Sequence, residues 1–148
     1  MIGARCGIYT PEEGRIECSG RMIVNDDVML FSKGHLEIGH NLGINQFSRI
    51  VAHEKIQIGK NVTIGQMVAI LDHDHAYHLE DGNLNLKGYK TKPIKIGDNV
   101  WIGDKAMILK GVEVGDNVVI GAHTLINKDV PEGSIVAGNP FKVIKKIS

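Results

Sequence analysis

Three histidines lie close together in one polar segment of the chain. The segment reads Asp72-His73-Asp74-His75-Ala76-Tyr77-His78. A histidine side chain changes its charge near neutral pH, which suits it to take a proton from a reacting hydroxyl as a general base. Neighbouring imidazoles are also good ligands for zinc. The residue types therefore leave two kinds of chemistry open, proton transfer and metal binding.

The histidines interrupt a repeat of six residues that runs through most of the chain. An α-helix would return an apolar residue every three or four positions, and a half-buried strand every second position, so neither explains this period. The aliphatic residues of the most regular stretch are Ile96, Ile102, Ile108, Val114, Ile120 and Ile126. Repeats of six residues are typical of parallel β-helices, and the chain is therefore predicted to be all-β.

The same period occurs earlier, in two series that are displaced from each other by two residues. The first series is Ile38, Ile44, Ile50 and Ile56, and the second is Ile58, Ile64 and Ile70. Three repeats per turn predict a triangular coil, with each coil stacked on the next at a strand spacing of about 4.8 Å. Residues 1–35 are less regular, although Val24, Leu30 and Leu36 are six apart and fit a first, imperfect coil.

The repeat is absent between Ile70 and Ile96. Because these polar residues, 72–93, lack the repeat, they are predicted to leave the coil as a protruding loop and to return to it. Loops of this length are usually functional or disordered. The repeat stops at Pro131, and the rest of the chain is predicted to form a short cap on the open end of the stack. The cap ends in residues 141–147, whose pattern fits either a strand or a helix.

Composition limits the classes of partner. The 148 residues are expected to form one domain, residues 1–148. The 17 basic and 17 acidic residues balance, which argues against nucleic acid, since its partners need a concentrated basic face. No stretch approaches the ~20 apolar residues of a membrane span, so a soluble, cytoplasmic protein is expected. Cys6 and Cys18 are accordingly expected to be reduced thiols.

Four features of the sequence together resemble the hexapeptide-repeat acyltransferases, and within them the maltose and galactoside O-acetyltransferase-like branch, which includes short sugar and polysaccharide O-acetyltransferases. They are the repeats, the loop after Asp72-His73, the block Gly97-Asp98-Asn99-Val100-Trp101-Ile102-Gly103, and the ending Ala137-Gly138-Asn139-Pro140. The resemblance implies a left-handed parallel β-helix. It also implies acetyl-CoA as acyl donor and a homotrimer with active sites in the clefts between neighbouring prisms.

The function implied by the resemblance is transfer of an acetyl group from acetyl-CoA to a hydroxyl of a sugar or surface-polysaccharide precursor. The implied general base is His73, with His75 in reserve. The activated hydroxyl would attack the thioester directly, and a backbone N–H would stabilise the oxyanion that forms. That donor falls at Asp104, where the family often has a small residue, and a carboxylate beside developing negative charge would be unfavourable.

The resemblance also assigns residues to the two substrates. Positions expected to bind the CoA donor are Trp101, Gly103, Asp104, Ala122, Asn127, Lys128, Lys142 and Lys145. Positions expected to bind the acceptor are Asn45, His53 and Asp72. His53 stands where galactoside enzymes have an acidic residue, so galactoside specificity does not follow. No metal is expected, and the acceptor is not identified by the sequence.

Two other functions remain compatible with the repeat. The first is a zinc enzyme like the gamma-class carbonic anhydrases, which bind zinc through histidines of adjacent subunits. The second is a noncatalytic β-helix that serves as a scaffold and needs neither a base nor a donor site. Sensitivity to a chelator and binding of acetyl-CoA distinguish the three.

Overall fold

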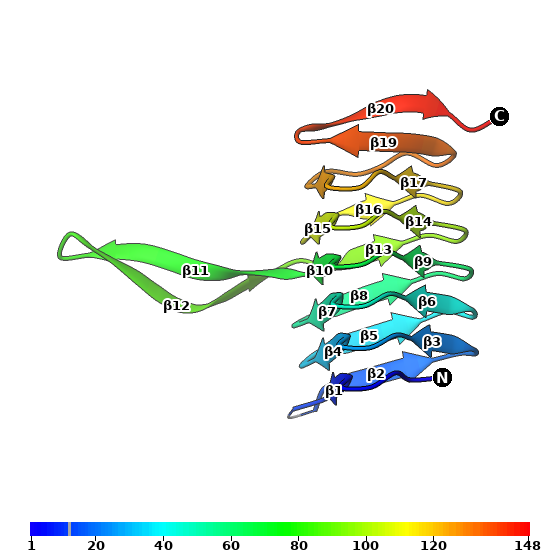
Figure 1. The fold of residues 1–148 in the computed structure, drawn as a ribbon. Helices are drawn as coiled ribbons and strands as arrows, with labels where there is room; N and C mark the ends of the chain where they lie inside the picture. Colours follow the sequence, from blue (N-terminus) through cyan, green and yellow to red (C-terminus); the bar gives the residue numbers. More distant parts are fainter. Residues whose placement is uncertain (12) are drawn as a thin grey trace.

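The computed structural model describes residues 1–11 and 13–148, and the regular structure in this part of the chain consists of strands. Figure 1 shows short strands stacked as a tall prism, with a two-stranded hairpin standing out from one side. The predicted left-handed parallel β-helix is therefore confirmed, an exception to the right-handed crossovers of most parallel sheets. No helix in the described residues is long and apolar enough to cross a membrane.

Three sheets form the sides of the prism, and their strands are parallel except for β20. Sheet 1 contains β1 (Gly7–Tyr9), β4 (Met29–Ser32), β7 (Arg49–Ala52), β10 (Ala69–Leu71), β15 (Met107–Leu109) and β18 (Leu125–Ile126). Sheet 2 contains β2 (Arg15–Cys18), β5 (His35–Ile38), β8 (Lys55–Ile58), β13 (Ile94–Ile96) and β16 (Glu113–Val114). Sheet 3 contains β3 (Met22–Val24), β6 (Leu42–Ile44), β9 (Thr63–Ile64), β14 (Trp101–Ile102), β17 (Val119–Ile120), β19 (Ser134–Gly138) and β20 (Phe141–Lys146).

The repeat aliphatics fill the inside of the prism. Leu36, Ile56, Ile102 and Ile108 are 0% exposed, and burial of one such side chain contributes about 1.5–3 kcal/mol. Above the hairpin Ile108 pairs with Ile126, which gives the predicted coil of 18 residues. Below it Leu36 pairs with Ile56, so these coils have 20 residues.

The two additional residues lie at the corner between sheets 1 and 2. There Ala52 is a further inward-facing residue and is completely buried. The prediction of three hexapeptides per turn is therefore wrong for the lower coils, and the longer corner explains why the two isoleucine series are displaced by two positions. Residues 1–35 are also more regular than predicted, because Ile8 pairs with Leu30 and Ile16 with Leu36.

The two ends of the stack differ. At the C-terminal end β19 pairs with β20 in antiparallel orientation, which confirms the cap and resolves residues 141–147 as a strand over Phe141–Lys146. Near the N-terminal end Cys6 and Cys18 are free thiols, in agreement with the prediction.

The protruding segment is an ordered hairpin rather than an irregular loop. Its strands are β11 (His73–Glu80) and β12 (Asn83–Thr91), paired antiparallel with a bulge after His75. Asp81 and Gly82 join them with positive φ angles of 51° and 76°, as two-residue hairpin turns require. At the base, the Lys92 N–H donates to the Asp72 carbonyl at 2.9 Å, so the chain returns to the coil beside the point where it left.

Asparagines line the corner between sheets 2 and 3. Asn41, Asn61, Asn99 and Asn117 have φ angles of 55–65°, a left-handed conformation that asparagine tolerates well. Each of the lower three donates from Nδ2 to Oδ1 of the asparagine in the next coil, at 3.1 Å. The Asn99 block of the sequence therefore marks a turn of the coil.

The close stacking at this corner leaves no room for a side chain at Gly59. A Cβ atom there would lie 2.5 Å from the Gly97 carbonyl oxygen, whereas a Cβ at Gly43 would meet nothing within 4 Å. We expect Gly59→Ala to destabilise the protein by about 1–3 kcal/mol in thermal or denaturant unfolding. The matched control Gly43→Ala should be neutral or stabilising by up to about 1 kcal/mol. Equal losses for the two variants would contradict this account of the corner.

Candidate active site

The predicted base lies where the chain leaves the prism. Sheet 1 strand β10 ends at Leu71, and His73 begins the hairpin one residue after the corner. The His73 ring stacks on His53 with a centroid distance of 3.7 Å and an interplanar angle of 3°. Tyr89 of the returning strand meets both rings edge-on, at 4.4 Å from His53 and 5.5 Å from His73. The His73 side chain is consequently only 15% exposed and is held on two sides.

The surroundings of His53 disfavour a positive charge on its ring. Burial lowers its pKa from the usual 6.5, and the positive charge that His73 would carry lowers it further, while Asp72 opposes the shift. Phe31 covers another side of the ring at a centroid distance of 5.9 Å. The residue expected to bind the acceptor is therefore a ring packed against the predicted base, in surroundings that favour its neutral form.

Asp72 lies beneath the two histidines and is 0% exposed. Its carboxylate accepts hydrogen bonds from the backbone N–H groups of His53, Glu54 and Lys55, each with a nitrogen–oxygen distance of 2.8 Å. Its Oδ1 also faces His73 Nδ1 at 3.3 Å. A carboxylate enclosed in this way has no oxygen left for an acceptor hydroxyl, so the expected direct contact with a sugar is replaced by contacts within the chain.

A second group of predicted residues lies at the corner between sheets 3 and 1. Trp101 is 58% exposed on the outer face of sheet 3, and Gly103 and Asp104 follow it at the corner. The Asp104 carboxylate points towards the coil below and accepts a hydrogen bond from the Gln66 N–H at 2.8 Å. The carboxylate is thus occupied by a backbone amide of the coil below.

Corner carboxylates cap the coil below at other places too. Asp98 accepts the Lys60 N–H at 2.8 Å, and Asp116 in turn accepts the Asp98 N–H at 2.7 Å. The register that pairs Ile102 with Ile120 puts Ala122 above Asp104, and alanine carries no carboxylate. The Asp104 N–H therefore has no carboxylate cap of the kind that Asp116 provides for Asp98.

The remaining predicted residues are divided between several parts of the prism. Asn45 lies low on the corner between sheets 3 and 1, where its amide accepts from Asn25 Nδ2 at 2.8 Å and donates to the Ile64 carbonyl at 3.0 Å. Asn127 and Lys128 follow β18 at the corner where His73 lies, two coils higher. Lys142 and Lys145 are exposed on β20 in sheet 3.

One prism does not bring the two groups together. His73 lies at the end of the sheet 1 strands, whereas Asp104 lies just before their start. The width of sheet 1 separates the predicted base from the predicted oxyanion donor. Residues 1–11 and 13–148 also contain no group of three or more His, Cys, Asp or Glu side chains placed to hold a metal ion within one chain.

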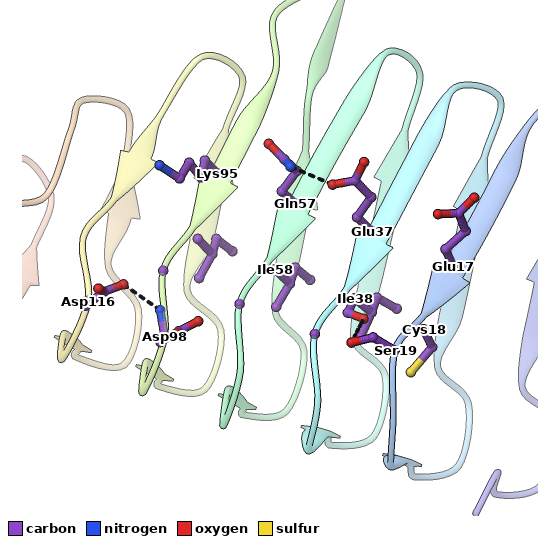
Figure 2. Close-up of a pocket in the computed structure, with 14 residues that line it drawn as sticks. Glu17, Cys18, Ser19, Glu37, Ile38, Gln57, Ile58, Lys95, Asp98 and Asp116 are labelled. Atoms are coloured by element: carbon purple, nitrogen blue, oxygen red, sulfur yellow. Dashed lines mark hydrogen bonds between the residues drawn. The ribbon is translucent and has the colours of Figure 1, made fainter.

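A groove of about 730 Å³ runs along the outer face of sheet 2, away from both groups (Figure 2). None of the predicted site residues lines it. Two of its polar side chains, Gln57 and Glu37, are paired with each other at 2.5 Å, and a third, Lys95, is paired with Glu113 at 2.9 Å. The histidine corner is the better candidate because it combines a partly buried base with an ordered hairpin.

Sequence reasoning missed three residues of this corner. Tyr89 contacts His53, His73 and His75, and Lys110 binds the Asp74 carboxylate from the coil above the hairpin. The turn Asp81-Gly82 between alternating apolar residues was a signal for the hairpin. A regular register from that turn would set Tyr89 opposite Asp74, and only the bulge after His75 brings it opposite His75. Phe31 and Lys110 come from other coils, and no local pattern indicates them.

Lowering the pH should cost the protein stability through His53. Its pKa is lowered in the folded chain, so the neutral form is favoured there, while the unfolded chain titrates near 6.5. The stabilisation is present above that value and is lost as the pH falls towards the lowered pKa. We expect the melting temperature of His53→Asn to fall less than that of the parent between about pH 7.5 and about pH 5. The exposed His40→Asn variant is the control, and equal falls for the parent and His53→Asn would contradict the assignment.

Comparisons with known proteins agree with this fold. The family "Bacterial transferase hexapeptide (six repeats)" matches residues 93–128. A Dictyostelium discoideum protein described as a putative acetyltransferase is 66% identical over 56 residues, which cover 38% of this chain and 30% of the relative. A Saccharomyces cerevisiae protein with the same description is 36% identical over 74 residues, which cover 49% of this chain and 38% of the relative. The matches thus span about a third of the length of these relatives.

Solved structures extend the likeness to 99% of the chain. The N-acyltransferase AntD from Bacillus cereus, in complex with dTDP and coenzyme A, has a TM-score of 0.82, 20% identity and 83% of its own chain covered. A maltose O-acetyltransferase from Clostridium difficile has a TM-score of 0.57, 29% identity and 69% of its chain covered. The predicted resemblance to the hexapeptide-repeat acyltransferases is thereby confirmed. Residues 93–128 match the family, and the fold of the whole chain is similar to that of the maltose O-acetyltransferase.

Proposed function

We propose that the protein is an O-acetyltransferase that transfers the acetyl group of acetyl-CoA to a hydroxyl of a sugar or saccharide precursor. The observation that carries the proposal is the half-buried His73 at the base of the hairpin, between the His53 ring and the Asp72 carboxylate. The acyl-CoA donor is supported by the AntD complex with coenzyme A and by the maltose O-acetyltransferase. The zinc and scaffold alternatives have no observation of this kind in their favour.

In the proposed reaction, Nε2 of His73 takes the proton of the acceptor hydroxyl as its oxygen attacks the thioester carbonyl carbon. A carbon–oxygen bond forms and gives a tetrahedral oxyanion. Collapse of this intermediate breaks the carbon–sulfur bond, and the proton passes from His73 to the sulfur of CoA. The products are the acetyl ester and free CoA thiol, and no group remains on the enzyme.

The oxyanion donor in this proposal is the backbone N–H of Asp104. The carboxylate at this position was expected to be unfavourable beside developing negative charge, but its Oδ1 is bound to the Gln66 N–H in the coil below. Ala122 above supplies no carboxylate that would occupy the Asp104 N–H. The departure from the small residue of the family is therefore compatible with oxyanion stabilisation.

We further propose that the active sites lie between neighbouring subunits of a homotrimer. Support comes from the separation of His73 and Asp104 by the width of sheet 1, since a second prism can present its Asp104 corner to the His73 corner of the first. A heterologous contact of this kind closes into a ring when it is repeated. In such a cleft His53 and Asn45 remain the candidates for acceptor binding, with Trp101 and Lys128 among those for the donor.

Replacing the base should stop transfer without preventing donor binding. We expect His73→Asn to lower kcat by about 10²–10⁴ with little change in the affinity for acetyl-CoA. The measurement is release of CoA thiol over a panel of sugars that carry hydroxyl or amino groups, with and without a chelator. His75→Asn is the matched control and should stay active. Activity that survives in His73→Asn but is lost in His75→Asn, or that depends on a metal, would refute the assignment.

The uncapped Asp104 amide gives a second prediction. In Ala122→Asp the new carboxylate would sit above Asp104 as Asp116 sits above Asp98, where it would occupy the N–H and add negative charge. We expect kcat to fall by about 10²–10³, the usual effect of losing one oxyanion donor. Ala122→Ser is the control for side-chain size and should retain most activity. An Ala122→Asp enzyme with normal kcat would rule out the Asp104 N–H as the donor.

A further inference from the structure

The corner between sheets 1 and 2 shows what the backbone needs in an ordinary coil. The N–H groups of Lys33 and Gly34 donate to the Ala52 carbonyl of the coil above, at 2.8 and 3.3 Å. The next amide, that of His35, donates to the Glu54 carbonyl at 3.0 Å. Three successive amides of the corner are thus satisfied by carbonyl oxygens of the following coil.

One coil higher, these carbonyls are missing because the chain leaves the prism to form the hairpin. The equivalent amides are those of His53, Glu54 and Lys55, as the pairing of His35 with Lys55 shows. All three donate instead to the side chain of Asp72. Asp72 occupies the inward position that Ala52 fills in the coil below, and it is equally buried. One carboxylate therefore replaces the backbone acceptors that the hairpin removes.

The geometry leaves one acceptor position of this carboxylate unused by the backbone. An ionised carboxylate has about four lone-pair sites, and three amides occupy three of them. The fourth faces Nδ1 of His73 at 3.3 Å. Because Asp72 has only acceptors to offer, the contact favours the tautomer in which Nδ1 carries the proton. Nε2 is then the atom of His73 that keeps its lone pair.

We propose that Asp72 is a positioning residue of the acyl transfer, which closes the coil at the hairpin exit and holds His73 as the Nδ1–H tautomer. The inference rests on the proposed function for its catalytic meaning, but the tautomer itself is a property of the free protein. Asp72 does not take the proton of the reaction. Its ionised oxygen stabilises the imidazolium that forms when Nε2 accepts the hydroxyl proton.

The tautomer can be measured without any substrate. Nitrogen NMR of protein with ¹⁵N-labelled histidine distinguishes Nδ1–H from Nε2–H, and His73→Asn assigns the signal. We expect His73 of the unaltered chain to be in the Nδ1–H form when neutral. An Nε2–H form, or an even mixture of the two, would overturn the proposal even if the protein proved to be an acetyltransferase. The Nδ1–H form in a protein without transfer activity would instead count against the proposed function alone.

The carboxylate can then be tested by Asp72→Asn, which keeps the shape and removes the charge. We expect the Nδ1–H population of His73 to fall, and kcat to drop by about 10²–10⁴ with KM for acetyl-CoA nearly unchanged. The control is Asp98→Asn, since Asp98 also caps a backbone amide but pairs with no histidine. If both variants lose stability and neither alters the tautomer or kcat, Asp72 has only a structural role and the proposal fails.

Discussion

The fold depends on one constraint, which is that the backbone amides and carbonyls of each coil are satisfied by the coil above or below. The strands are short, two to six residues in the prism, and none is stable by itself. Stability accumulates because every coil supplies both the hydrogen-bond partners and the apolar side chains that its neighbour needs. The same constraint makes the corners tight, so glycine and asparagine stand where backbones approach or turn left-handed.

The candidate base lies where this pattern of hydrogen bonding is interrupted, and the candidate oxyanion donor lies at a corner where an amide has no side-chain cap. At the hairpin exit the coil carbonyls are missing, and Asp72 takes their place directly beside His73. At the opposite edge of sheet 1 Asp104 caps the Gln66 amide, and Ala122 above it has no carboxylate with which to cap the Asp104 amide. The hairpin exit is the place where the regular stack is broken, and it is there that a carboxylate and an imidazole are brought into contact.

Much of the fold could be predicted because it follows from a repeat. The isoleucine period gave the coil, the break after Ile70 gave the protrusion, and the resemblance gave the hand and the family. The 20-residue coils could not be predicted from the sequence. Ala52, at the longer corner between sheets 1 and 2, fits an apolar pattern whether the coil has 18 or 20 residues. The burial of Asp72 could not be predicted from the sequence either. Its carboxylate, at the hairpin exit, binds backbone amides that lie a full coil earlier in the chain.

The central claim is that a complete site joins the His73 corner of one prism to the Asp104 corner of another. The most direct measurement is the activity of mixed assemblies, made by unfolding and refolding His73→Asn and Ala122→Asp chains together in equal amounts. An assembly of either variant alone should be nearly inactive. Random mixing of the two variants should restore about a quarter of the normal activity, since one cleft in four would hold both native corners. Mixed assemblies that form but stay as inactive as the assemblies of one variant would contradict the account.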